Sequence, residues 1–121
     1  MQVVIVAKSG RLRDGLQAML DSFPALQPLA LEESGPAALE AIGRQQPALV
    51  IVDADLCDED RADWVKAMKQ EWNRARCLAI AGRLAQFQPF LDAGADEVLL
   101  KGFSAAELRA AIKKLLDWRQ D

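Results

Sequence analysis

The chain has 121 residues, a length that suits one domain built around one hydrophobic core. Hydrophobic residues make up 51% of the sequence and charged residues 27%, which excludes a disordered or collagen-like chain. The formal net charge of −3 argues against direct contact with nucleic acid, because binding to a duplex depends on a basic face.

The sequence carries no signal for export or for a membrane. It has no apolar stretch of about 18 or more residues, and residues 1–7 lack the basic region that precedes the apolar part of a signal peptide. We therefore expect residues 1–121 to form a single cytoplasmic domain with no membrane partner. Cys57 and Cys77 lack the paired spacing of a metal site and are expected to be reduced thiols.

Five short apolar runs are expected to form strands, with longer segments of helical period between them. The runs lie at residues 3–7, 28–31, 48–52, 77–81 and 97–100. The first and third runs are apolar without alternation, as is typical of strands that are covered on both faces. This order of segments predicts an α/β fold with a doubly wound, five-stranded parallel sheet.

The helices are predicted by apolar stripes between these runs. Stripes at helical spacing occupy residues 12–23, 38–42 and 65–72, in chain order. The segment 83–92 is expected to be a short or irregular fourth helix, because Pro89 cannot donate a backbone hydrogen bond.

The last helix has the clearest start signal. Ser104 followed by Glu107 is a capping-box pattern, and an apolar stripe from Leu108 to Leu116 follows it. This helix is expected to run nearly to residue 121.

The ends of the strands carry the residues with reactive chemistry. In an open parallel sheet, ligands collect outside the carboxyl ends of the strands, near the point where the strand order reverses. Lys8 follows the first run, Asp53 follows the third and Lys101 follows the fifth. The sequence therefore predicts a carboxylate between two lysines, a pairing that would keep Asp53 ionised.

These residues lie in segments that resemble the receiver domain of bacterial response regulators. The strand-end Asp53, residues 3–16 and the segment 93–104, which contains Leu-Leu-Lys-Gly-Phe-Ser, carry the resemblance. It covers essentially the whole chain and is closest to receivers that precede helix-turn-helix output domains. It implies a flavodoxin-like (βα)5 fold, a role in two-component signalling, Asp53 as phosphoacceptor and Lys101 as the charge partner of the phosphoryl group.

The sequence departs from the receiver pattern around the reactive aspartate. The acidic pair that holds magnesium in receivers is matched here by Ala7 and Lys8, the hydroxyl residue of the fourth strand by Ala81, and the switch aromatic of the fifth strand by Val98. Magnesium requires oxygen ligands, so no metal or other cofactor is expected. A weak magnesium site formed by Asp53 and Asp55 is the alternative.

The leading hypothesis is an atypical receiver that is not an enzyme and acts through protein contacts, with Lys8 paired to Asp53 in place of the metal. One alternative is a conventional receiver that a histidine kinase phosphorylates on Asp53. Another is a small flavodoxin-like ligand-binding domain, although neither common phosphate-binding glycine pattern is present.

The expected partners are a histidine kinase or an output domain, with no direct contact to nucleic acid. A homodimer through the fourth helix, fifth strand and fifth helix is also considered. The residues singled out for such an interface are Phe87, Phe90, Val98 and Trp118.

Overall fold

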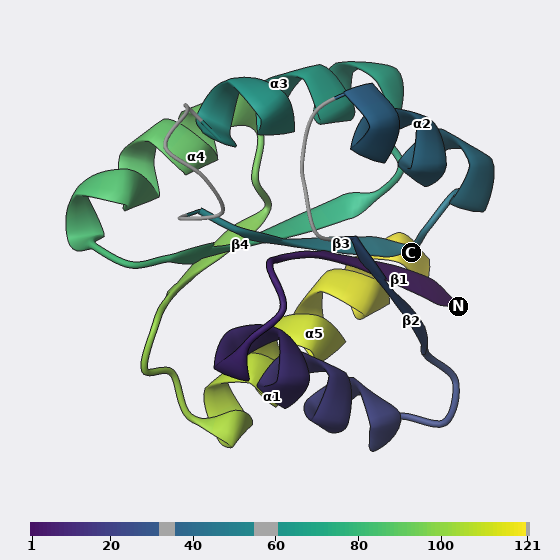
Figure 1. Ribbon diagram of the computed structural model, residues 1–121, viewed down its shortest axis with the longest axis vertical. Helices are drawn as coiled ribbons and strands as arrows, with labels where there is room; N and C mark the ends of the chain where they lie inside the picture. The colour runs from purple at the N-terminus through teal and green to yellow at the C-terminus, as the bar shows by residue number, and fades with distance from the viewer. Residues whose placement is uncertain (32–35, 55–60, 121) are drawn as a thin grey trace.

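The computed structural model describes residues 1–31, 36–54 and 61–120, without the side chains of residues 61 and 117–120. Five parallel strands form one sheet in the order β2-β1-β3-β4-β5 (Figure 1). The strands are β1 (Gln2–Val6), β2 (Gln27–Leu31), β3 (Leu49–Asp53), β4 (Arg76–Ala81) and β5 (Glu97–Leu100). The predicted doubly wound fold is confirmed, and the predicted strand bounds differ from these by one residue or none.

Five helices cover the two faces of the sheet. They are α1 (Arg11–Asp21), α2 (Pro36–Gln45), α3 (Arg61–Glu71), α4 (Phe87–Ala93) and α5 (Ala105–Gln120). Figure 1 shows α1 and α5 on one face, and α2, α3 and α4 on the other. None of the helices within the described ranges combines the length and apolarity that a membrane span requires.

The core has two halves because side chains alternate between the faces of a strand. Val3 and Ile5 of β1 pack with the buried residues of α1 and α5, while Val4 and Val6 pack with those of α2, α3 and α4. β1 is buried on both faces for this reason, which explains its unbroken apolar run.

Helix α4 is short, as predicted from Pro89, and a 3-10 turn, η1 (Leu84–Gln86), precedes it. Pro89 is the third residue of α4, where a backbone N–H would have no partner within the helix. The helix ends at Gly94, whose φ of 112° is in the left-handed region that glycine adopts without strain.

The predicted capping box starts α5. The Glu107 backbone N–H donates to Ser104 Oγ at 3.0 Å, and the Ser104 N–H donates to Glu107 Oε1 at 3.1 Å. Leu108, Ile112 and Leu115 then face the sheet and are fully buried or nearly so. Because Ser104 directly precedes α5, this cap also fixes where the loop after β5 must end.

Candidate functional site

The carboxyl ends of the strands form the edge of the sheet at which the reactive residues were predicted. Asp53 is the last residue of β3, and Lys101 directly follows β5. β1 and β3 are neighbours in the sheet, but the helices that follow them, α1 and α3, lie on opposite faces (Figure 1). Lys8 and Asp53 therefore flank the point at which doubly wound sheets bind their ligands.

Asp53 and Lys101 form the predicted ion pair. Lys101 Nζ lies 3.2 Å from Asp53 Oδ1, and the two side chains are 37% and 14% exposed respectively. The backbone holds Lys101 in place, since its N–H donates to Ala81 O at 2.7 Å. The next residue, Gly102, has a φ of 95° in a turn closed by the Phe103 N–H donating to Leu100 O at 3.1 Å. This turn directs the Lys101 side chain back over Asp53.

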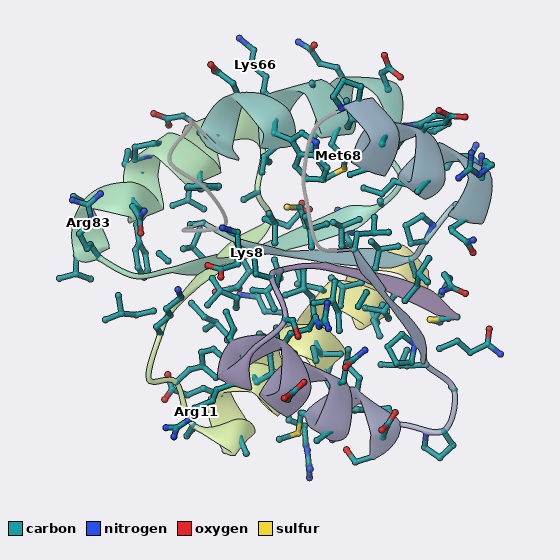
Figure 2. The ribbon with its side chains drawn as sticks, in the orientation of Figure 1. Lys8, Arg11, Lys66, Met68 and Arg83 are labelled. Atoms are coloured by element: carbon teal, nitrogen blue, oxygen red, sulfur yellow. The ribbon has the colours of Figure 1, made fainter. Side chains whose placement is uncertain are left out.

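Lys8 does not form the expected pair with Asp53. Its side chain is exposed and makes no ion pair with any residue in the described ranges (Figure 2). The cause lies in the end of β1: the Ala7 N–H still donates to Leu31 O at 3.0 Å, and Ala7 is buried. Lys8 is therefore the first residue after β1 that faces solvent.

The described part of this edge does not suit a magnesium ion. Ala7 and Ala81 are buried and offer no side-chain oxygen, and the Asp53 carboxylate contacts Lys101. Within the described ranges, no three carboxylate, thiol or imidazole side chains gather where they could hold a metal. Asp55 and Cys57 lie outside the described residues. The charged side chains described at this edge are those of Lys8, Lys101 and Asp53, which are two ammonium groups and one carboxylate. This set does not fit magnesium, which needs several oxygen ligands.

Two of the predicted interface residues belong to the core. Phe90 and Val98 are 4% and 7% exposed and pack in the same buried cluster, so their assignment to an interface is wrong. Phe87 packs against that cluster and is only partly buried. The side chain of Trp118 lies outside the described part of α5. Phe90 is covered because it packs in one cluster with Ala79 and Ala81 of β4 and Val98 of β5.

Other apolar side chains are exposed on this side of the molecule. Leu84 of η1 is 73% exposed, Leu91 of α4 is 43% exposed and Leu100 of β5 is 38% exposed. Their exposure was not predicted from the sequence, although Leu84 and Leu91 are spaced by about two helical turns and are out of phase with Phe90. That spacing was the available signal for an outward-facing pair.

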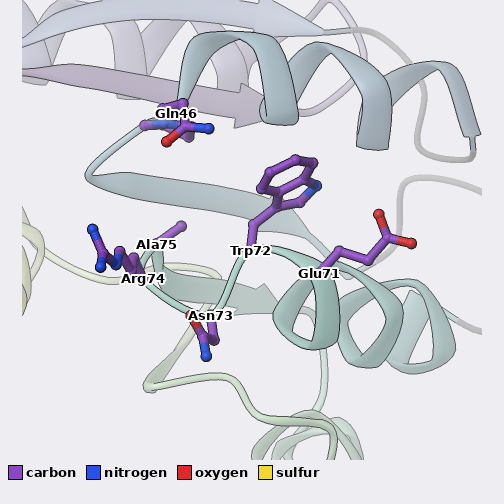
Figure 3. Close-up of a pocket in the computed structure, with 7 residues that line it drawn as sticks. Gln46, Glu71, Trp72, Asn73, Arg74 and Ala75 are labelled. Atoms are coloured by element: carbon purple, nitrogen blue, oxygen red, sulfur yellow. The ribbon is translucent and has the colours of Figure 1, made fainter.

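The opposite edge of the sheet carries a second feature, built around Trp72. Trp72, Arg74 and Ala75 belong to the turn between α3 and β4, and they line a cavity of about 330 Å³ (Figure 3). The indole of Trp72 lies directly over Gly43 of α2. A Cβ atom at Gly43 would lie 2.3 Å from Cζ2 of the indole, which is shorter than any real contact. Only glycine at this position lets α2 approach Trp72 so closely.

Replacing Gly43 with alanine is expected to lower the free energy of unfolding by about 2 kcal/mol, because the added methyl forces the indole out of its position. The matched control is Gly15→Ala in α1, where a Cβ atom meets nothing within 4 Å. That control should gain about 0.5–1 kcal/mol from helix propensity. Urea unfolding followed by circular dichroism measures both, and equal gains in the two variants would show that the Trp72 contact is absent in solution.

Comparison with known proteins agrees with the geometry of the fold. The family model described as response regulator receiver domain matches residues 3–113. A transcriptional regulatory protein of the KDP operon, KdpE from Escherichia coli, is 29% identical over 116 residues, covering 94% of this chain and 50% of the relative. The response regulator VraR from Staphylococcus saprophyticus is 22% identical, covering 94% of this chain and 56% of the relative. The chain thus spans about half the length of these relatives.

Solved structures show the same fold. A LuxR-family two-component response regulator from Aurantimonas matches with a TM-score of 0.83 and 23% identity, covering 98% of this chain and 86% of the other. A CheY-like receiver domain protein from Methanospirillum hungatei matches with a TM-score of 0.78 and 19% identity, covering 98% and 95%. At these identities the likeness concerns the fold alone.

Proposed function

Because the chain belongs to the response regulator receiver domain family, we propose that it is an atypical receiver that signals through protein contacts and without magnesium-dependent phosphorylation of Asp53. It is the receiver domain of a response regulator in two-component signalling. We also propose that the chain acts in the cytoplasm.

One observation carries the proposal: the described strand ends beside Asp53 carry lysines and alanines at the positions where the receiver pattern has oxygen ligands. Lys101 Nζ lies 3.2 Å from the carboxylate, Lys8 follows β1 and forms no ion pair with a described residue, and Ala7 and Ala81 supply no side-chain oxygen. Phosphoryl transfer depends on neutralising the charge of the moving group, and a divalent metal usually does this. The described lysines of this edge act against the dication that would assist the reaction.

The experiment is incubation with acetyl phosphate and magnesium, followed by intact-mass spectrometry. We expect the wild-type chain to remain unmodified. The variant Lys8→Asp is expected to gain an adduct of one phosphoryl group, because the change removes a cation and adds two oxygen ligands at the strand end. Asp53→Asn in the Lys8→Asp background is the control and should lose that adduct.

A conventional receiver, phosphorylated on Asp53 by a histidine kinase, is the second candidate, and the Asp53–Lys101 pair favours it. Its signature in the same experiment is a hydrolysable adduct on the wild-type chain that Asp53→Asn removes. That result would overturn the proposal.

The surface proposed for the signalling contact is formed by Leu84, Leu91 and Leu100. These side chains lie on η1, α4 and β5, which follow one another in the chain and are packed together. Exposed leucines scattered singly are ordinary, but three on adjoining elements favour a protein partner. A histidine kinase or an output domain is the proposed partner, and a second copy of the chain is the other possible occupant. KdpE is named as a transcriptional regulatory protein, and control of transcription through an output domain is proposed here by analogy.

A further inference from the structure

The hollow surface beside Trp72 is not used by the proposed function. It lies at the amino-terminal edge of the sheet, because its residues come just before β3 and β4, whereas Asp53 lies at the carboxyl edge. Besides the cavity of about 330 Å³, a second cavity of about 500 Å³ lies between α2 and α3. Glu71 and Trp72 line both cavities. Trp72 is thus a partly exposed ridge with a hollow on each side.

The indole that forms this ridge has a nitrogen atom that lacks a hydrogen bond to any described residue. The Nε1 atom of Trp72 is buried and has no hydrogen-bond partner within the described part of the chain. Tryptophan at a surface with adjoining pockets is the residue type that contributes most to binding energy in protein interfaces. The combination of ridge and hollows therefore suits contact with another protein surface.

The charged side chains around Trp72 indicate which kind of protein surface would bind there. Glu71 and Arg74 are both exposed, and neither makes an ion pair with any described residue. Figure 3 shows their side chains pointing to opposite sides of the Trp72 indole. The neighbouring Glu40 and Arg44 already pair with each other at 2.9 Å. The unpaired charges therefore follow the order negative, indole, positive across the ridge.

We propose that two copies of this chain associate through the surface formed by Glu71, Trp72 and Arg74, about a two-fold axis that passes beside Trp72. A two-fold axis in the plane of an interface brings each residue opposite the one on the other side of the axis. Glu71 then lies opposite the partner's Arg74, and Arg74 lies opposite the partner's Glu71. The Trp72 indole of each copy then packs beside the indole of the other copy and against the cavities next to it.

A second copy fits this surface better than an unlike protein, because the surface complements itself. Its free charges balance, so it selects neither an acidic nor a basic partner. The association also leaves Asp53 and the leucines of η1, α4 and β5 uncovered, since these lie on other parts of the molecule. The dimer is therefore independent of any change at Asp53.

Charge exchange tests the pairing by sedimentation velocity at low ionic strength. The wild-type chain should sediment with twice the 13.3 kDa mass of one chain. Glu71→Arg and Arg74→Glu should each raise the dimer dissociation constant by about tenfold or more, because each places like charges opposite one another twice. The double variant Glu71→Arg/Arg74→Glu should restore the wild-type constant, and added salt should weaken the wild-type dimer.

Two controls separate this surface from others. Lys66→Glu makes the same change of charge as Arg74→Glu but on the outward face of α3 (Figure 2), and Leu84→Asp changes the surface proposed for the signalling partner. Both should leave the dimer intact. A monomeric wild-type chain, a dimer that Leu84→Asp dissociates, or a double variant that stays as weak as the single ones would overturn the proposed association. None of these results bears on phosphorylation of Asp53.

Discussion

Replacing Asp96 with alanine is expected to lower the free energy of unfolding by about 3 kcal/mol. Asp96 Oδ2 accepts hydrogen bonds from Lys69 Nζ at 3.0 Å and from the Cys77 backbone N–H at 2.8 Å. Its Oδ1 atom lies 3.5 Å from Arg76 Nη1. One carboxylate thus joins α3, the start of β4 and the residue just before β5.

The magnitude follows from burial. The side chains of Lys69 and Asp96 are 16% and 17% exposed. Removing one partner of a buried ion pair costs about 3–5 kcal/mol, because the remaining charge is left unpaired, and partial access to water places this case at the lower end. The Cys77 N–H also loses its acceptor, which adds a desolvation cost.

Urea unfolding followed by circular dichroism measures the effect. The control is Glu40→Ala, which removes the Glu40–Arg44 pair of α2, where both side chains are about two-thirds exposed or more. Exposed pairs contribute about 0–1 kcal/mol, so the control should change little. Losses of equal size in the two variants would contradict the role assigned to Asp96.

Raising the pH from 8 to 10.5 is expected to destabilise the wild-type chain by about 2 kcal/mol through Cys77 alone. The pKa of the Cys77 thiol is raised from 9.0 to about 12, chiefly by burial and also by the Asp96 carboxylate, while Lys69 acts in the opposite direction. The folded chain therefore keeps the thiol protonated at a pH where the unfolded chain releases the proton. Stability from this group is complete below pH 9.0 and is lost as the pH rises toward 12.

The measurement is the free energy of unfolding in urea at several pH values for the wild-type chain and for Cys77→Ala. The two proteins share every other ionisable group, so the difference between their pH profiles isolates Cys77. That difference should decline by about 1.4 kcal/mol per pH unit above pH 9. Parallel profiles would mean that Cys77 is not buried.

Much of the fold was predictable because it depends on local chemistry. Pro89 limits the length of α4 whatever the helix packs against, since a proline has no backbone N–H to donate. Ser104 and Glu107 cap α5 through hydrogen bonds between residues three positions apart. The buried strands are visible as apolar runs because both of their faces are covered.

The site was predictable only in part. Asp53 and Lys101 meet because the carboxyl ends of parallel strands lie at one edge, a consequence of topology that the order of segments already implies. Lys8 belongs to the same edge but turns to solvent, because the buried Ala7 before it sets the direction of the chain. Lys8 and Asp53 therefore lie at the same edge of the sheet, but their side chains do not form an ion pair.

The sequence by itself determined the class of fold, the strand and helix order, the cap of α5 and the Asp53–Lys101 pair, because each of these follows from short-range periodicity or from strand direction. Only the tertiary structure decided that Phe90 and Val98 are buried, that Asp96 gathers two cations, and that Trp72 lies over Gly43. Each of those contacts joins elements distant in the chain. Its energy depends on the packing angle and the separation between the elements, which no local pattern of residues encodes.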